Sequence, residues 1–209
     1  MILTMDIETV PSRAGWVIED VKEKVSPPSN IKKAESIQKW WEEKAPAALD
    51  EKHHACGLDA ATGEIICIGY GAEDFGAFYG KSEGDIISDF FDLYSRDRVP
   101  PTLVGFNHIS FDLPFIWRRA KVHGIAIPQG FPVDVKPWDA VSTDVMLMWS
   151  GARGRISQDK LCKVFGIGGK VGMSGADVWD YYKAGRLEEI AEYCINDVRI
   201  CSELYELLR

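Results

Sequence analysis

The sequence of 209 residues has no uncharged hydrophobic run of the length that crosses a membrane. Its first residues also lack the basic start and the long apolar stretch of a signal peptide. The few cysteines stand far apart, form no C-x-x-C pair and are typical of reduced thiols: Cys56, Cys67, Cys162, Cys194 and Cys201. We therefore expect no membrane partner, no disulfide framework and a cytoplasmic location.

Basic residues are also few: the sequence has 24 Lys and Arg against 32 Asp and Glu, which gives a net charge of −8. This balance argues against a protein that binds any polyanion through charge alone, since such proteins carry a basic surface. Residues 150–172 and the cluster of Arg118, Arg119 and Lys121 are nevertheless locally basic. Taken singly, each of these clusters is most simply interpreted as a solvated face.

The order of the expected elements indicates an α/β fold. Short strands are predicted over 2–8, 64–71, 75–80 and 103–106, and helices over 82–94, 111–123, 158–165, 176–183 and 187–208. Residues 11–60 are polar and broken by prolines, with helical pieces over 16–24 and 31–44. We interpret residues 1–209 as a single domain, with a central mixed sheet flanked by helices and a helical insertion, 11–60, after the first strand.

Two acids stand side by side at the end of the first strand. Asp6 and Glu8 are two residues apart, so they project from the same face of that strand. Unpaired, they would raise the pKa of each other, and a hard divalent cation shared between them would remove the repulsion. A solvated strand end is the plain alternative.

The last helix carries a less expected acid. Asp197 interrupts an apolar row of this helix, and Tyr193 lies one turn earlier on the same face. A carboxylate that faces inward is costly unless it is paired or bound to a metal. An ion pair of Asp197 with Arg199 or Arg186 is the alternative.

The third candidate stretch, Gly-Phe-Asn-His-Ile-Ser-Phe-Asp over 105–112, runs from a strand end into a helix. Asp112 falls in the first helical turn, where the helix dipole favours a negative charge. Asp112 as a helix-terminus acid and Asn107 as a turn residue are the plain alternatives.

Together and in this order, the motifs Asp6-x-Glu8, Asn107-x-x-x-Phe111-Asp112 and Tyr193-x-x-x-Asp197 resemble the DEDD superfamily of 3′–5′ exonucleases, and the tyrosine marks its DEDDy branch. The amino-acid sequence of residues 105–120 is similar to that of the proofreading domain of family B DNA polymerases and of related stand-alone exonucleases. A helix and glycine loop over 156–170 is similar to the same group. The resemblance covers residues 1–9 and about 102–200, and it implies a ribonuclease H-like fold.

The resemblance also implies a site and a reaction. Asp6, Glu8, Asp112 and Asp197 would hold two Mg²⁺ or Mn²⁺ ions, and the Tyr193 hydroxyl would orient the attacking water. Nucleic-acid contacts would come from Thr9, Asn107, Phe111, Arg119 and Lys170. The reaction would release nucleoside 5′-monophosphates from the 3′ end of nucleic acid, with single-stranded DNA as the expected substrate.

Three other functions stay open at this point. The chain could be an inactive nucleic-acid-binding or regulatory domain of the same fold, an exonuclease that acts on RNA, or a protein that works through the 11–60 segment.

Overall fold

A computed structural model of the chain describes residues 1–72, 74–136, 139–169 and 172–209. The chain divides into two compact units, one formed by Met1–Thr9 with Ile65–Arg209 and the other by Val10–Glu64. Among the described residues, no helix combines the length and the apolar character that crossing a bilayer requires.

A five-stranded sheet in the order β3-β2-β1-β4-β5 forms the centre of the fold: β1 (Ile2–Pro11), β2 (Gly63–Gly71), β3 (Phe75–Tyr79), β4 (Thr102–Gly105) and β5 (Ser142–Asp144). β2 and β3 are antiparallel, whereas β4 runs parallel to both β1 and β5. The consecutive residues Leu3, Thr4 and Met5 are all buried, so both faces of β1 are covered. The predicted mixed sheet flanked by helices is confirmed.

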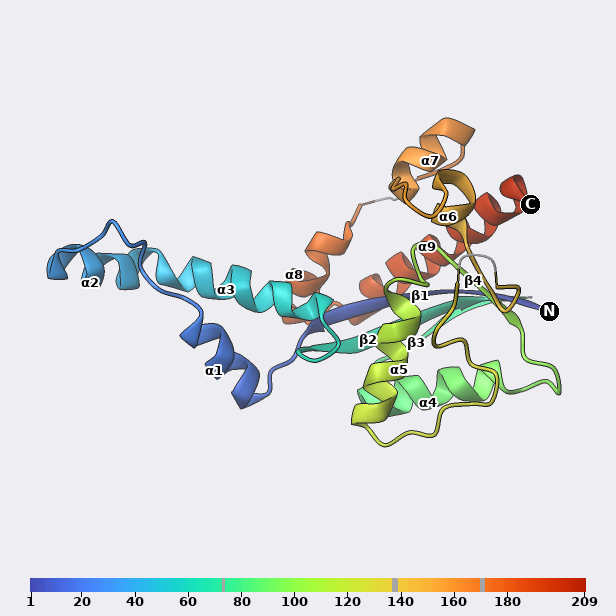
Figure 1. Cartoon of the computed structure of the whole chain (residues 1–209), viewed down its shortest axis with the longest axis horizontal. Helices are drawn as coiled ribbons and strands as arrows, with labels where there is room; N and C mark the ends of the chain where they lie inside the picture. The colour runs from blue at the N-terminus through green and yellow to red at the C-terminus, as the bar shows by residue number, and fades with distance from the viewer. Residues whose placement is uncertain (73, 137–138, 170–171) are drawn as a thin grey trace. The chain divides into compact units, whose positions relative to one another are not determined.

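Helices cover this sheet on both sides (Figure 1): α4 (Glu83–Tyr94), α5 (Asp112–Val122), α6 (Val145–Ser150), α7 (Gln158–Phe165), α8 (Val178–Lys183) and α9 (Leu187–Leu208). The helix α9 packs against β3 and β4, while α4 contacts β3 and α5. Ser82 caps α4 by accepting a hydrogen bond from the backbone N–H of Asp85, and Ser157 caps α7 in the same way. Both caps agree with the predicted helix starts.

The strand β5 and the helix α6 are not foreseen in the sequence analysis. They contain three and six residues, too few for a hydrophobic period to be recognised. Asp144 joins them, since its carboxylate accepts hydrogen bonds from the backbone N–H groups of Met146 and Leu147 at the start of α6.

The register of the parallel strands determines where the polar residues of β1 emerge. Thr4 pairs with Val104, and β4 ends one residue later at Gly105. β1 continues to Pro11, so Asp6 and Glu8 lie beyond the end of β4. Because the carboxyl ends of parallel strands meet at one edge, the loop after β4 comes close to these two acids.

The second unit consists of α1 (Gly15–Glu23), α2 (Ala34–Glu43), α3 (Ala45–Ala55) and the short 3₁₀ helix η1 (Cys56–Leu58). Within this unit α3 packs against both α1 and α2, and the backbone N–H of Ser12 donates to the carbonyl of Thr62. The helical pieces predicted over 16–24 and 31–44 correspond to α1 and α2, whereas α3 is not predicted. Pro46 lies in the first turn of α3, where its missing N–H has no intrahelical partner to lose.

The contact between β2 and α9 depends on a glycine. A Cβ atom at Gly69 would lie 2.8 Å from Sγ of Cys194 and 2.9 Å from a methyl carbon of Val198, closer than such atoms approach. Because Gly69 has no side chain, α9 can lie against the sheet. The thiol of Cys194 on this helix thereby comes close to Asp6 of β1.

We predict that Gly69→Ala destabilises the protein by about 1–3 kcal/mol, because the added methyl group must push α9 away from β2. For a chain of this size the expected loss in Tm is on the order of 5 °C. Gly84→Ala is the matched control, since a Cβ there has 3.7 Å of clearance from His123 and α4 gains a better helix former. Thermal unfolding followed by circular dichroism measures both, and equal Tm values for the two variants would contradict the argument.

Candidate active site

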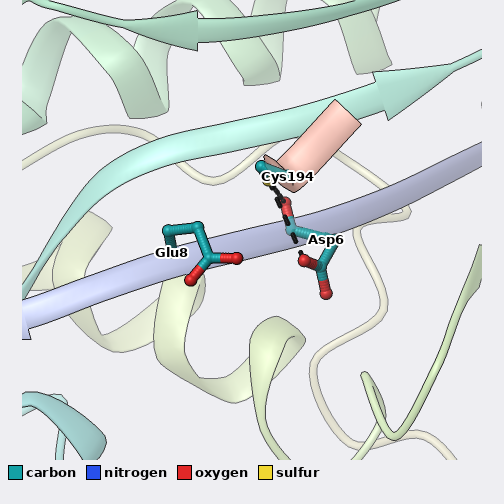
Figure 2. A group of neighbouring side chains, drawn as sticks. All are labelled: Asp6, Glu8 and Cys194. Carbon is teal, nitrogen blue, oxygen red and sulfur yellow. Dashed lines mark hydrogen bonds between the residues drawn. The ribbon is translucent and has the colours of Figure 1, made fainter. Parts of the chain in front are cut away.

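Asp6 and Glu8 project from the same side of β1, as their spacing predicts (Figure 2). Glu8 is 8% exposed, and Asp6 is partly buried. Cys194 approaches from α9, with its Sγ 3.8 Å from Oδ2 of Asp6 and 3.6 Å from the Asp6 carbonyl oxygen. Ligand atoms of all three residues lie within 4.8 Å of one another, the spacing that a single metal ion requires.

The thiol in this group favours its neutral form in the protein without a bound ion. Its hydrogen bond with Cys67, its burial, and the charges of Asp6 and Glu8 raise the pKa of Cys194 well above its ordinary value. The donors that fit a divalent cation are therefore the two carboxylates. Such oxygen donors suit Mg²⁺ or Mn²⁺ better than Zn²⁺.

Asp112 joins these acids from the first turn of α5. Its carboxylate accepts a hydrogen bond of 3.1 Å from the backbone N–H of Ile7, the residue between Asp6 and Glu8. This bond fixes the start of α5 against β1, and Asp112 is 3% exposed. Burial, together with the charge of Asp144, raises the pKa of Asp112 to about 7.

Asp197 and Tyr193 come from successive turns of α9, and both are buried. Burial, the charges of Asp197 and Glu8, and a hydrogen bond to Asp197 raise the pKa of the Tyr193 hydroxyl far above its ordinary value. The hydroxyl therefore stays protonated at neutral pH. The two arginines considered as alternative partners of Asp197 have other neighbours, since Arg186 pairs with Glu189 and Arg199 lies over the ring of Phe75.

One cavity of about 620 Å³ unites the predicted acids and the tyrosine. Asp6, Glu8, Asp112, Asp197 and Tyr193 all line it, and three separate elements, β1, α5 and α9, supply them. Residues far apart along the chain thus line one cavity.

Two of the predicted nucleic-acid contacts, Asn107 and Phe111, also line this cavity. Asn107 has a φ of 62°, a left-handed conformation that asparagine tolerates better than most residues. Its backbone N–H donates to Oδ1 of Asp144 at 2.9 Å, which holds the turn between β4 and α5. Asn107 therefore adopts the turn conformation considered for it and also lines the cavity.

Two more of the predicted contacts, Thr9 and Arg119, do not line the cavity. Thr9 follows Glu8 on β1, so its side chain belongs to the opposite face. Arg119 is buried in α5, where its guanidinium donates two hydrogen bonds to Glu83 at 2.8 and 2.6 Å. Lys170 lies outside the described residues.

Several residues of the cavity wall are not singled out in the sequence, among them Gln158, Ser174 and Gly175, and Arg155 is noted there only as part of the basic segment 150–172. Gln158 is buried, and its side-chain amide donates to the carbonyl of Asp197 at 2.9 Å. The resemblance of residues 156–170 to related exonucleases is the signal that could have located Gln158.

A family model described as "Predicted 3′-5′ exonuclease related to the exonuclease domain of PolB" matches residues 78–205. The chain belongs to this family. The resemblance inferred from the three motifs is thereby confirmed.

Two polymerases show how this PolB-related family member compares with longer proteins. A DNA polymerase of Red sea bream iridovirus is 24% identical over an alignment of 157 residues that covers 65% of this chain and 16% of the polymerase. The family B DNA polymerase from the hyperthermophilic archaeon Pyrobaculum calidifontis is 20% identical with a TM-score of 0.60, over 99% of this chain and 24% of the polymerase. The chain thus spans about a quarter or less of either one. The structural likeness confirms the ribonuclease H-like fold.

For this PolB-related protein we predict a pH-dependent gain of stability from Asp112→Asn when divalent ions are removed with EDTA. The folded-state pKa of about 7 lies above the unfolded value of about 3.9, so the wild-type loses stability as pH rises from about 4 to about 7. At pH 8 the variant, which keeps an acceptor for Ile7, should melt on the order of 5 °C higher than the wild-type.

The difference should vanish near pH 4, where the folded wild-type also carries a neutral group at residue 112. Asp97→Asn, a change at an exposed loop residue, is the control and should show no such pH dependence. Thermal melts across this pH range measure the effect, and a Tm difference that is constant with pH would refute it.

A second prediction concerns the buried ion pair between Arg119 and Glu83. Burial alone would raise the pKa of Glu83, but the hydrogen bonds from Arg119, the Ile65 backbone and His123 outweigh it and lower the pKa. Arg119→Ala leaves this carboxylate buried without its main partner, so we expect a loss of about 3–5 kcal/mol.

The exposed neighbour Arg118 provides the matched control, because Arg118→Ala should shift the Tm little. Denaturant unfolding of both variants measures the difference. A stable Arg119→Ala protein with weakened nucleic-acid binding would instead favour the binding role expected from the sequence.

Proposed function

We propose that the chain is a metal-dependent 3′–5′ exonuclease that releases nucleoside 5′-monophosphates from the 3′ end of single-stranded DNA. The observation that carries this proposal is the convergence of four carboxylates and Tyr193 on one cavity. Family membership supports the reaction class. A charge-rich pocket of this kind would repel itself without cations, which is the physical reason to expect metal ions there.

Asp6, Glu8, Asp112 and Asp197 would hold the ions. By the family's pattern, these four carboxylates would together be the ligands of both ions. Two divalent ions would supply activation of the attacking water and neutralise charge on the leaving 3′ oxygen. The raised pKa of Asp112 supports this assignment, because a buried carboxylate that prefers to be neutral gains most from a bound cation.

Tyr193 would act as a fixed hydrogen-bond group. Its hydroxyl stays protonated at neutral pH, so Tyr193 is unsuited to the role of general base. Its hydrogen bond with Asp197 places the hydroxyl beside a proposed metal ligand, where it can orient the attacking water.

The cavity wall supports a nucleic-acid end as the substrate. Phe106 and Phe111 bring aromatic rings to the wall, and an aromatic ring can stack on a base of any sequence. Asn107 adds a polar amide beside them. We propose DNA because the two compared proteins are named DNA polymerases.

We predict that Asp197→Ala lowers the release of mononucleotides by on the order of a thousand-fold or more, since a proposed metal ligand is removed. Tyr193→Phe should retain metal binding and lose about 10–100-fold, because only the orientation of water is affected. A 3′-labelled oligonucleotide incubated with Mn²⁺ provides the assay, with a 5′-labelled copy to establish direction and EDTA to remove ions.

Glu188→Ala, at an exposed position on the same helix, is the matched control and should leave activity unchanged. Circular dichroism would show that each variant is folded. Normal turnover by Asp197→Ala would refute the proposal. Binding of a 3′ end without digestion would favour an inactive binding domain, and faster digestion of an RNA strand would redirect the substrate assignment.

A further inference from the structure

Arg155 is the one positively charged residue among the described residues that line the cavity. Five acids line the same space: Asp6, Glu8, Asp112, Asp159 and Asp197. The side chain of Arg155 is exposed and forms no ion pair within the described part of the chain. Neutralising a neighbouring carboxylate therefore does not account for its place in the cavity wall.

The backbone that follows Arg155 is held by two contacts. Ile156 packs against a core cluster that includes Val104 and Leu161. Gln158 donates to the carbonyl of Asp197 on α9. Because both neighbours are fixed to the body of the unit, the cation is carried to the cavity by an ordered segment.

Burial differs between the acids and this cation. Glu8, Asp112 and Asp197 are at most 8% exposed, whereas Arg155 is exposed. A scissile phosphate must reach the buried carboxylates, so the rest of the strand leaves past the exposed rim. The next phosphate upstream would then meet a guanidinium, whose planar donors suit phosphate oxygens.

We propose that Arg155 binds the substrate phosphate immediately upstream of the scissile one. The inference rests on the proposed exonuclease function and deepens it, since it names the residue that recognises a strand rather than a single nucleotide. It also gives an acidic protein a specific cationic contact at the cavity, where a broad basic surface is not required.

Two substrates test this assignment, a single-stranded (dT)₁₀ oligonucleotide and the p-nitrophenyl ester of thymidine 5′-monophosphate, which has one phosphodiester and no upstream phosphate. Arg155→Ala should raise KM for (dT)₁₀ by about ten-fold with kcat little changed, and leave the ester unaffected. Arg155→Lys should restore part of the lost affinity. The slope of log(kcat/KM) against log salt should fall in magnitude by about 0.7 for (dT)₁₀, the value for one lost contact to a single strand.

Arg153→Ala is the matched control, because Arg153 is exposed on the same segment and does not line the cavity. An unchanged KM for (dT)₁₀ in Arg155→Ala, an equal effect of Arg153→Ala, or an equal loss on the ester would each overturn the inference. If the wild-type releases no product from either substrate, the proposed function fails. In that case fluorescence anisotropy of labelled (dT)₁₀ tests the role of Arg155 separately, because binding needs no turnover. Arg155→Ala is still expected to bind (dT)₁₀ more weakly than the wild-type.

Discussion

Repulsion among buried carboxylates is the constraint on which the rest of this structure depends. Asp6, Glu8, Asp112 and Asp197 line one cavity, and three of the four are almost inaccessible to water. Burial favours the neutral form of a carboxyl group, and it is the main cause that raises the pKa of Asp112, with a smaller contribution from the charge of Asp144. The scaffold must therefore hold these side chains together against their own electrostatics, through contacts that do not depend on the carboxylate charges.

Those contacts come from backbone geometry and packing. The N–H of Ile7 holds Asp112 from within the very stretch of β1 that carries Asp6 and Glu8. Gly69 permits α9 to lie against β2, so that the helix that carries Asp197 approaches the strand edge closely. The support of these acids is thus distributed over the sheet and two helices, α5 and α9.

The sequence predicts the site acids better than the walls around them. Asp6 and Glu8 follow from the period of a strand, and Asp197 from an interrupted helical row, because both patterns are regular and local. The role of Arg119 could not be predicted in this way. Its charge suggests a contact at the surface, and only the tertiary structure shows that it pairs with Glu83. Arg155 and Ser174 lie in irregular segments that line the cavity. Such segments have no hydrophobic periodicity from which the position of a side chain could be predicted.

The contrast between Asp112 and Asp144 separates two uses of a buried acid. Both are at most 4% exposed, and burial alone would raise the pKa of either. Asp144 accepts hydrogen bonds from the backbone N–H groups of Asn107 and Ile109, and Nδ1 of His108 lies 3.7 Å from its carboxylate. These neighbours lower the pKa of Asp144 below its ordinary value. Asp144 is thus stabilised as an anion by the protein itself, whereas the hydrogen bonds to Asp112 do not offset its burial. A buried acid whose anion the protein does not stabilise, and which lines a cavity, is suited to bind an external cation. We therefore assign Asp112 to the proposed metal ligands and Asp144 to a structural role.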